Sequence, residues 1–261
     1  MHVRSLLLLL IGSALWSHDF WIEPSSFRPA ANGPLLLRLW VGPAFQGEPM
    51  PRLDTLMVRF NLWDSEGERG VPGREGTDPA GALLAGKVGP LWIYYFSRAS
   101  SVVLEGAKFE TYLKDEGLEE ISRFRALRGE TASSAKDNFV RCAKAFLSVG
   151  GPTGNRDYDH GFGLPLELML EADPSASEQL PVRLVYQGKP VQGALVTVFH
   201  KNSPVPKASL RTDAKGRVLL PLDGSGMWLV KSTHMEPDGD GQWNSYWASL
   251  TFQRDLGSHA R

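Results

Sequence analysis

The sequence predicts a mainly β fold of the α+β class: a β-rich N-terminal part with a helical insert, followed by a C-terminal β-sandwich. Three observations predict it. Short apolar runs bounded by turn residues recur along the chain, one central region changes to helical spacing, and strand-and-turn units follow one another closely after Pro181. The 261 residues, 42% of them hydrophobic and 22% charged, suffice for a sizeable core.

Strands are predicted over residues 35–41 and 56–63, because each is an apolar run closed by turn-forming residues. The stretch 67–89 is rich in Gly and Pro and is expected to form a long surface loop. The next run, 91–96, carries large side chains at both odd and even positions. It is therefore predicted to be a strand covered on both faces.

A helical insert is predicted over about residues 105–149. Its first part has apolar residues at helical spacing with Lys and Glu between them, and Gly117 is expected to divide it into two short helices. A further helix is predicted over about 134–148, where the apolar stripe is Phe139, Ala143, Phe146 and Leu147. The single cysteine, Cys142, lies in this pattern and is expected to be buried.

The C-terminal half is predicted to be a sandwich of short strands over residues 181–186, 194–200, 210–222 and 227–233. Within the third of these, Asp213 and Gly216 predict a hairpin turn, since Asp hydrogen-bonds its own backbone and Gly accepts a positive φ. The aromatic run from Trp243 to Trp247 precedes a strand-like segment, and core packing is the favoured interpretation.

The N-terminus has the pattern of an export leader, with Arg4 ahead of a short apolar run. A periplasmic or secreted location is therefore expected. Cleavage after Ser17 would make His18 the first residue, but it puts Leu15 rather than a small residue at the third position back. Cleavage after Ala14 has Gly12 and Ala14 at the key positions and fits the small-residue rule as well or better. The predicted organisation is a signal peptide over 1–17, a β-rich domain with the helical insert over 18–176, a sandwich over 177–256 and a tail over 257–261.

Several segments resemble known families. "GKPVQGALVTV", "TDAKGRVLLPL" and "GMWLVKS" resemble the prealbumin-like or carboxypeptidase-regulatory-like sandwich module, which implies a fold more than an activity. Over nearly the whole chain, "HDFWIEP", "FETYLKDEGLEEI", "AKAFLSVGG", "LPLELML" and "WLVKSTHM" together resemble the bacterial exported family DUF4198. That family is of unknown function and has long been described as the periplasmic, substrate-specific component of nickel or cobalt uptake.

The resemblance implies a metal-binding or metal-delivery protein and points to His18 and His234, where the family pattern has histidines. A terminal His18 would offer its amine and ring nitrogens, and His234 an imidazole, to nickel, cobalt or copper. His200 is a weaker third candidate at the end of a predicted strand. A membrane transporter or an outer-membrane receptor is the expected partner. His160, between Asp159 and a glycine, could add to a mixed oxygen and nitrogen site, although a solvated loop is favoured.

Other function classes are less favoured. The net charge of −1 is spread along the chain, so nucleic acid is not expected to be a partner. A carbohydrate- or protein-binding module that uses exposed aromatic residues without a metal is the alternative to metal delivery. A copper-dependent oxygenase fits less well, because a helical insert and a prealbumin-like module do not match its core, and a hydrolase lacks a GxSxG motif. A non-enzymatic role is therefore predicted.

Overall fold

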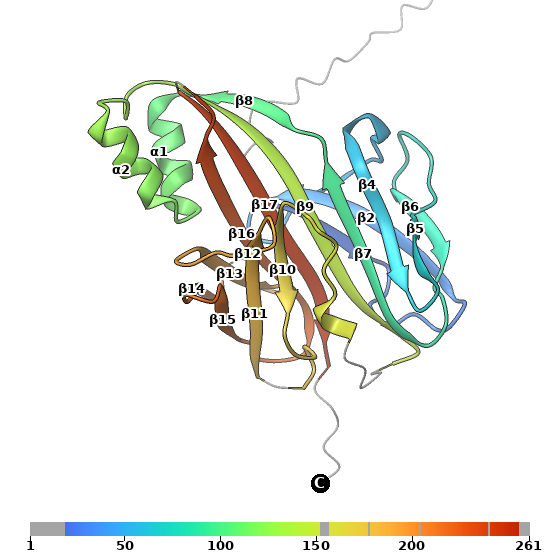
Figure 1. The fold of residues 1–261 in the computed structure, drawn as a ribbon. Helices are drawn as coiled ribbons and strands as arrows, with labels where there is room; N and C mark the ends of the chain where they lie inside the picture. The colour runs from blue at the N-terminus through green and yellow to red at the C-terminus, as the bar shows by residue number, and fades with distance from the viewer. Residues whose placement is uncertain (1–18, 152–156, 177, 204, 240, 256–261) are drawn as a thin grey trace, which may run out of the picture.

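The computed structural model describes residues 19–151, 157–176, 178–203, 205–239 and 241–255. The predicted leader, His18 and the predicted tail lie outside the described residues. Within them, the chain forms three β-sheets and two α-helices (Figure 1). This arrangement confirms the prediction of a mainly β fold.

The largest sheet has nine strands and forms the middle of the molecule. Its order is β14-β13-β16-β17-β9-β7-β4-β5, and β8 also pairs with β9. The strands are β4 (Met57–Asp64), β5 (Gly67–Gly70), β7 (Gly89–Ser97), β8 (Ser100–Leu104), β9 (Ala135–Val149), β13 (Leu195–His200), β14 (Ala208–Arg211), β16 (Gly226–Pro237) and β17 (Gln242–Arg254). The long strands β9 and β17 pair in parallel, so this one sheet joins residues from both sides of the predicted boundary at residue 176.

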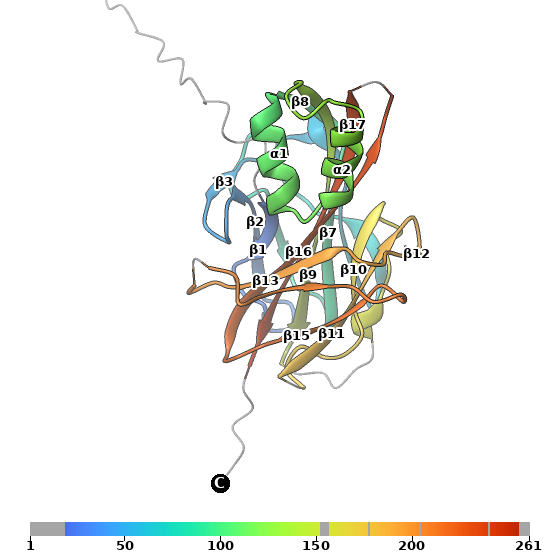
Figure 2. The same ribbon diagram turned by 90° about the vertical axis from the view of Figure 1, so that its left-hand side faces the viewer.

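Two smaller sheets cover the opposite faces of the central sheet. One contains β1 (Asp19–Pro24), β2 (Pro34–Gly42), β3 (Glu48–Met50) and β6 (Gly81–Leu84). The other contains β10 (Leu166–Leu170), β11 (Gln179–Tyr186), β12 (Lys189–Pro190) and β15 (Arg217–Pro221). Figure 2 shows β1, β2 and β3 on one side of β16, β9 and β7, and β10 and β12 on the other. The fold is therefore a three-layer β structure.

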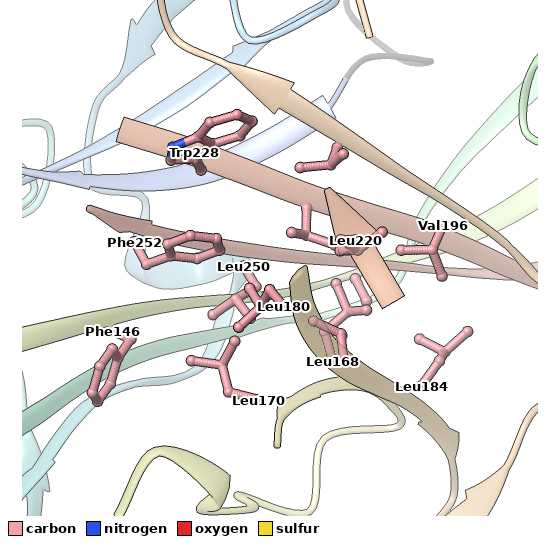
Figure 3. Packing of buried hydrophobic residues seen from close by; sticks show 14 of the residues in the cluster. Phe146, Leu168, Leu170, Leu180, Leu184, Val196, Leu220, Trp228, Leu250 and Phe252 are labelled. Atoms are coloured by element: carbon pink, nitrogen blue, oxygen red, sulfur yellow. The ribbon is translucent and has the colours of Figure 1, made fainter. Parts of the chain in front are cut away.

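Both faces of the central strands are buried because successive side chains in a strand point to opposite sides. In β9, Ala145 and Leu147 pack against the β1–β2 layer, while Cys142 and Phe146 pack against the β10–β11 layer. Figure 3 shows the second of these cores, to which Phe146, Leu168 and Leu180 belong. Residues 91–95 of β7 are all 0–1% exposed, which confirms that this strand is covered on both faces.

The helix predicted over residues 134–148 is wrong, because this segment is the strand β9. A strand that is buried on both faces carries apolar residues at odd and even positions alike, and such a run also satisfies a helical stripe. Pairing decides the outcome: β17 lies along one edge of β9, and β7 and β8 lie along the other. Cys142 is buried as expected, with 1% of its surface exposed.

The two helices cover one end of the central sheet, on the face that also carries β1 (Figures 1 and 2). They are α1 (Gly106–Asp115) and α2 (Glu119–Leu127), and Gly117 between them has a φ of +68°. The predicted division at this glycine is confirmed, since a left-handed backbone ends α1. Neither helix of the described chain is long and apolar enough to cross a membrane.

The remaining predicted strands correspond to β2, β4, β11, β13 and β16, but two loop predictions need correction. The expected surface loop 67–89 contains the short strands β5 and β6, which pair with β4 and β2. The predicted turn at Asp213 forms, with its carboxylate accepting from the backbone N–H of Lys215 and Arg217. However, the flanking strands belong to different sheets, because β14 pairs with β13 and β15 pairs with β11. The turn therefore carries the chain from one layer to another.

A buried ion pair joins the central sheet to the β10–β11 layer. The Nζ of Lys144 on β9 lies 3.0 Å from the Oε1 of Glu167 on β10, and the two side chains are 1% and 3% exposed. The backbone N–H of Phe162 also donates to this oxygen, at 2.8 Å. Burial lowers the pKa of Lys144, while Glu167 opposes that shift. Glu167 thus compensates the positive charge of Lys144, which β9 places in the core.

The carboxylate of Asp137 on β9 lies beneath the helices. Asp137 is 2% exposed, and its Oδ2 accepts from the Oγ of Ser245 at 2.7 Å. Tyr112 of α1 packs over this site, with its ring stacked on Trp247 at 5.4 Å. Burial raises the pKa of Asp137 to about 6, against the lowering effect of the hydrogen bond from Ser245. The helical cover therefore disfavours the charged form of Asp137.

We expect the Glu167→Gln variant to lose about 3 kcal/mol or more of its free energy of unfolding, because Lys144 would remain buried without an opposing charge. Urea unfolding measures this loss. The matched control is Glu66→Gln, which removes an exposed partner of Lys87 and should cost less than about 1 kcal/mol. The double variant Lys144→Met/Glu167→Leu should recover stability relative to Glu167→Gln. Equal losses at the buried and exposed pairs would contradict the role given to Glu167.

The stability of the protein should depend on pH through Asp137. Its folded pKa of about 6 lies above the unfolded value of 3.8, so the folded state binds the proton more tightly. Relative to the Asp137→Asn variant, the wild type should gain about 3 kcal/mol of unfolding free energy as the pH falls from 7 to below 4. Chemical unfolding of both proteins across this range provides the measurement. A constant difference between them would show that Asp137 titrates normally.

Candidate functional site

The described chain begins with a buried charge cluster. The Nζ of Lys231 on β16 lies 2.6 Å from the Oδ1 of Asp19 and 2.8 Å from the Oε1 of Glu116, the residue after α1. The hydroxyl of Thr233 donates to the other oxygen of Glu116 at 2.8 Å. Burial lowers the pKa of Lys231, but the two carboxylates raise it further, so the side chain stays charged. The cluster fixes the start of β1 to the helical insert.

His234 lies on the opposite face of β16 from this cluster, because positions 231 and 234 alternate in a strand. Its ring is 4.2 Å from the ring of Tyr186 on β11. Burial lowers the pKa of His234, an effect that Glu236 opposes. The imidazole is therefore neutral at neutral pH, and it lines a groove of about 640 Å³ between α2 and the loop that precedes β13.

His200 lies far from His234. Its partner across β13 and β16 is Trp228, six residues before His234 in the same strand, which places the two histidines roughly 20 Å apart at ~3.3 Å per residue. The Nε2 of His200 is already 2.9 Å from the carbonyl oxygen of Ser225. The two histidines share a sheet face, as the sequence suggested, but the structure does not bring them together.

The described residues do not form a metal centre by themselves. Among them, no three His, Cys, Asp or Glu side chains come close enough to hold a metal ion. His160 stacks on Trp63 at a ring distance of 4.0 Å rather than joining a carboxylate cluster. The described residues alone therefore do not fit a metal centre, and pairing of His18 with His234 stays a prediction.

The aromatic run near the C-terminus belongs mainly to the core. Trp243 is 2% exposed and lies beneath the helices, with its ring 6.2 Å from Phe109 and 6.0 Å from Phe124. Trp247 is half-buried and stacks on Tyr112. The favoured core interpretation is confirmed for Trp243, and these side chains do not form an open aromatic platform.

An apolar cleft opens on the face of the central sheet between β3 and β8. Its volume is about 450 Å³, within the range of small-molecule sites. The floor is formed by Phe139 and Arg141 of β9, which point to the same side of the strand. The remaining lining residues come from β2, β3, the 3₁₀ turn Asp54–Leu56 with its preceding segment, and β8: Val41, Glu48, Pro49, Met50, Pro51, Leu53, Leu56 and Ser100.

Arg141 is the charged group in the floor of this cleft. Its guanidinium lies over the rings of Phe20 and Phe139, with Cζ 5.1 and 5.4 Å from the ring centroids. Its Nη1 lies 3.9 Å from the Sδ of Met50, a weak acceptor. Burial lowers the pKa of Arg141, and Tyr95, whose own pKa burial raises to about 12, offers no negative charge at neutral pH. Within the described chain, Arg141 forms no ion pair.

This arrangement suits binding rather than bond making. Apolar walls remove a ligand's hydrocarbon surface from water, and one cation in the floor can orient a polar end. The floor belongs to a strand paired along both edges, so Phe139 and Arg141 are held in place before a ligand arrives. The cleft thus has the composition of a preformed small-molecule site.

The sequence does not predict this cleft, because its pattern favours a core-packed helix over the segment that carries Phe139 and Arg141. One signal was available: Arg141 and Lys144 interrupt the apolar run from Phe139 to Val149, and charged residues in such a run are buried only when something compensates them. The walls could not be inferred in the same way. They come from segments about 40 residues or more away in the chain, including Met50 and Ser100.

Comparisons with known proteins give a family but no activity. A family model described as a domain of unknown function, DUF4198, matches residues 15–236. No curated protein matches the chain.

Two solved structures are weakly similar. The tetra-tandem repeat in the extending region of a large adhesion protein is 13% identical, with 91% of this chain and 49% of that chain covered and a TM-score of 0.23. This chain thus spans about half the length of that structure. Native alpha-2-macroglobulin from Escherichia coli, spanning domains MG0-NIE-MG1, is 11% identical, with 87% and 96% covered and a TM-score of 0.22. Both scores are low, so neither structure informs the function of this chain.

Proposed function

This chain belongs to the DUF4198 family, whose domain has no assigned function, and we propose that it is an exported binding protein for a small, largely apolar molecule. The observation that carries the proposal is the cleft of about 450 Å³ above Phe139 and Arg141. A medium-length hydrocarbon chain or an aromatic compound of two or three rings fits such a space.

The walls of the cleft set the expected affinity. A ligand that buries roughly 200 to 300 Å² of apolar surface gains roughly 5 to 8 kcal/mol before the costs of association are subtracted. A dissociation constant of 1 μM requires about 8 kcal/mol. Apolar contacts alone therefore support binding weaker than about 1 μM, and tighter binding needs a polar contact in the cleft.

Metal delivery is a second candidate function, and the state of His234 favours it. Burial keeps this imidazole neutral, which is the form that binds a transition metal, and it lines the 640 Å³ groove together with Glu119 and Glu120. Under this proposal His18 supplies its amine and ring nitrogens, the metal is nickel, cobalt or copper, and a transporter or receptor takes the ion.

The C-terminal strands are further proposed to form a prealbumin-like sandwich module. Strands β13 and β16 lie in the central sheet, while β11 and β15 lie in the facing layer. Val196, Leu184 and Leu220 from these two layers share one core, which is the packing that such a module requires.

We expect the neutral fluorophore N-phenyl-1-naphthylamine to bind in the cleft with an affinity weaker than about 1 μM. The variant Ser100→Trp places a large side chain in the cleft and should weaken this binding at least about tenfold, since the ligand volume is filled. Fluorescence titration provides the measurement.

The matched control is Ser101→Trp. Ser101 is the next residue of β8, points to the opposite face and is exposed. Binding by the Ser101→Trp variant should equal that of the wild type. Absence of fluorophore binding, or equal binding by the two variants, would refute the cleft as a ligand site.

For the metal candidate, the intact mass of the exported protein first establishes whether His18 is its first residue. Calorimetric titration with Cu(II) and Ni(II) should then show at least about tenfold weaker binding for His18→Ala and His234→Ala. His200→Ala is the control, because the Nε2 of His200 already contacts the carbonyl of Ser225. If His18→Ala binds both ions as tightly as the wild type, the chelate does not exist.

A further inference from the structure

We infer that the cleft selects ligands that carry one carboxylate at the end of an apolar body, and that the guanidinium of Arg141 binds this carboxylate. The inference rests on the proposed function, because it names the ligand class of the same cleft. Its starting point is the contrast between the largely apolar walls and Arg141 in the floor, which forms no ion pair with any described residue.

Other buried cations of this protein are compensated by the fold itself. Lys144 contacts Glu167, Lys231 contacts Asp19 and Glu116, and the Nε of Arg125 lies 2.8 Å from Glu110. The buried Arg254 forms no ion pair within the described residues, but its Nη1 donates to the carbonyl of Gly224 at 2.9 Å. Each of these four cations thus contacts at least one carboxylate or carbonyl oxygen.

Arg141 has no comparable partner. The side-chain contacts that the described residues give its guanidinium are two aromatic rings and the thioether of Met50. Aromatic faces stabilise a cation modestly, but they leave its in-plane N–H groups without strong acceptors. Glu48 lines the cleft at its exposed rim and forms no ion pair with Arg141 within the described chain. An acceptor from outside the protein would therefore complete the coordination of Arg141.

The geometry favours a carboxylate as that acceptor. A guanidinium presents parallel N–H groups that match the two oxygens of a carboxylate, and such bidentate pairs are among the strongest hydrogen bonds in proteins. A single guanidinium balances one negative charge, which suits a monoanion better than a phosphate monoester. The neighbouring walls, Leu53, Leu56 and Phe139, then receive the hydrocarbon part of the ligand.

The stacking of Arg141 also fixes its direction. Phe20 of β1 and Phe139 of β9 hold the guanidinium, and its backbone N–H donates to the Oγ of Ser97 at 2.9 Å. A lysine at this position would keep the charge but lose both the planar stacking and the fork of donors. Arginine is thus the residue type that this role requires.

The experiment compares octanoate, 1-octanol and octylammonium as competitors of N-phenyl-1-naphthylamine at neutral pH. Octanoate should bind about 10- to 100-fold more tightly than 1-octanol, because a hydrogen bond between charged groups strengthens binding by about this factor. Octylammonium should bind most weakly. Each methylene added to the acid should tighten binding about fourfold until the cleft is full.

Three variants assign the preference to Arg141. Arg141→Met should bring octanoate to the affinity of 1-octanol while leaving 1-octanol unchanged. Arg141→Lys should keep part of the preference, and it preserves the test if the methionine variant does not fold. The matched control is Arg59→Met, which removes a guanidinium stacked on Tyr94 and Phe96 at 5.2 and 5.7 Å, outside the cleft, and should change neither affinity.

The outcomes separate this inference from the proposed function. If the fluorophore binds and Ser100→Trp blocks it, but octanoate and 1-octanol compete equally, the cleft is a ligand site without selectivity for acids and the inference is overturned. Survival of the acid preference in Arg141→Met would overturn it as well, and so would an undiminished preference in Arg141→Lys if the methionine variant does not fold. If no compound binds, the proposed function itself is refuted.

Discussion

The structure depends on the double burial of β9. This strand is paired along both edges and covered on both faces, so it lies where all three layers and the helical insert meet. Every polar side chain that it carries into this environment needs a partner, because an unpaired buried charge costs several kcal/mol. The layers must therefore supply partners at three positions of β9, namely Asp137, Arg141 and Lys144.

The three layers meet this requirement in different ways. The β10–β11 layer gives Lys144 a carboxylate, and β17 gives Asp137 the hydroxyl of Ser245. The layer of β1 gives Arg141 the ring of Phe20 and the thioether of Met50, neither of which carries a negative charge, and the cleft opens beside it. Each buried charge on β9 needs a partner. Glu167 meets this need at Lys144, whereas the cleft beside Arg141 leaves room for a ligand to meet it. Stability and the proposed binding function follow from one strand.

The histidines show how topology limits a site that sequence suggests. His200 and His234 belong to neighbouring strands and share a face, yet their register separates them by roughly 20 Å. His234 is three residues from Lys231 of the Asp19 cluster, but the two side chains point to opposite faces of β16. A metal site that includes His234 must therefore be completed from outside the described residues, whereas the cleft at Arg141 is complete within them.

The sequence by itself determined the features that depend on local chemistry. Short apolar runs between turn residues predicted most strands, the run 91–96 predicted a doubly covered strand, and Gly117 predicted the break between the helices. Only the tertiary structure decided that 135–149 is a strand, because a run buried on both faces has no period of its own and takes its conformation from its neighbours. The cleft was hidden for the same reason. Its floor is on β9 and its walls come from segments distant in the chain, and contacts between distant segments are set by the packing of layers rather than by any local pattern.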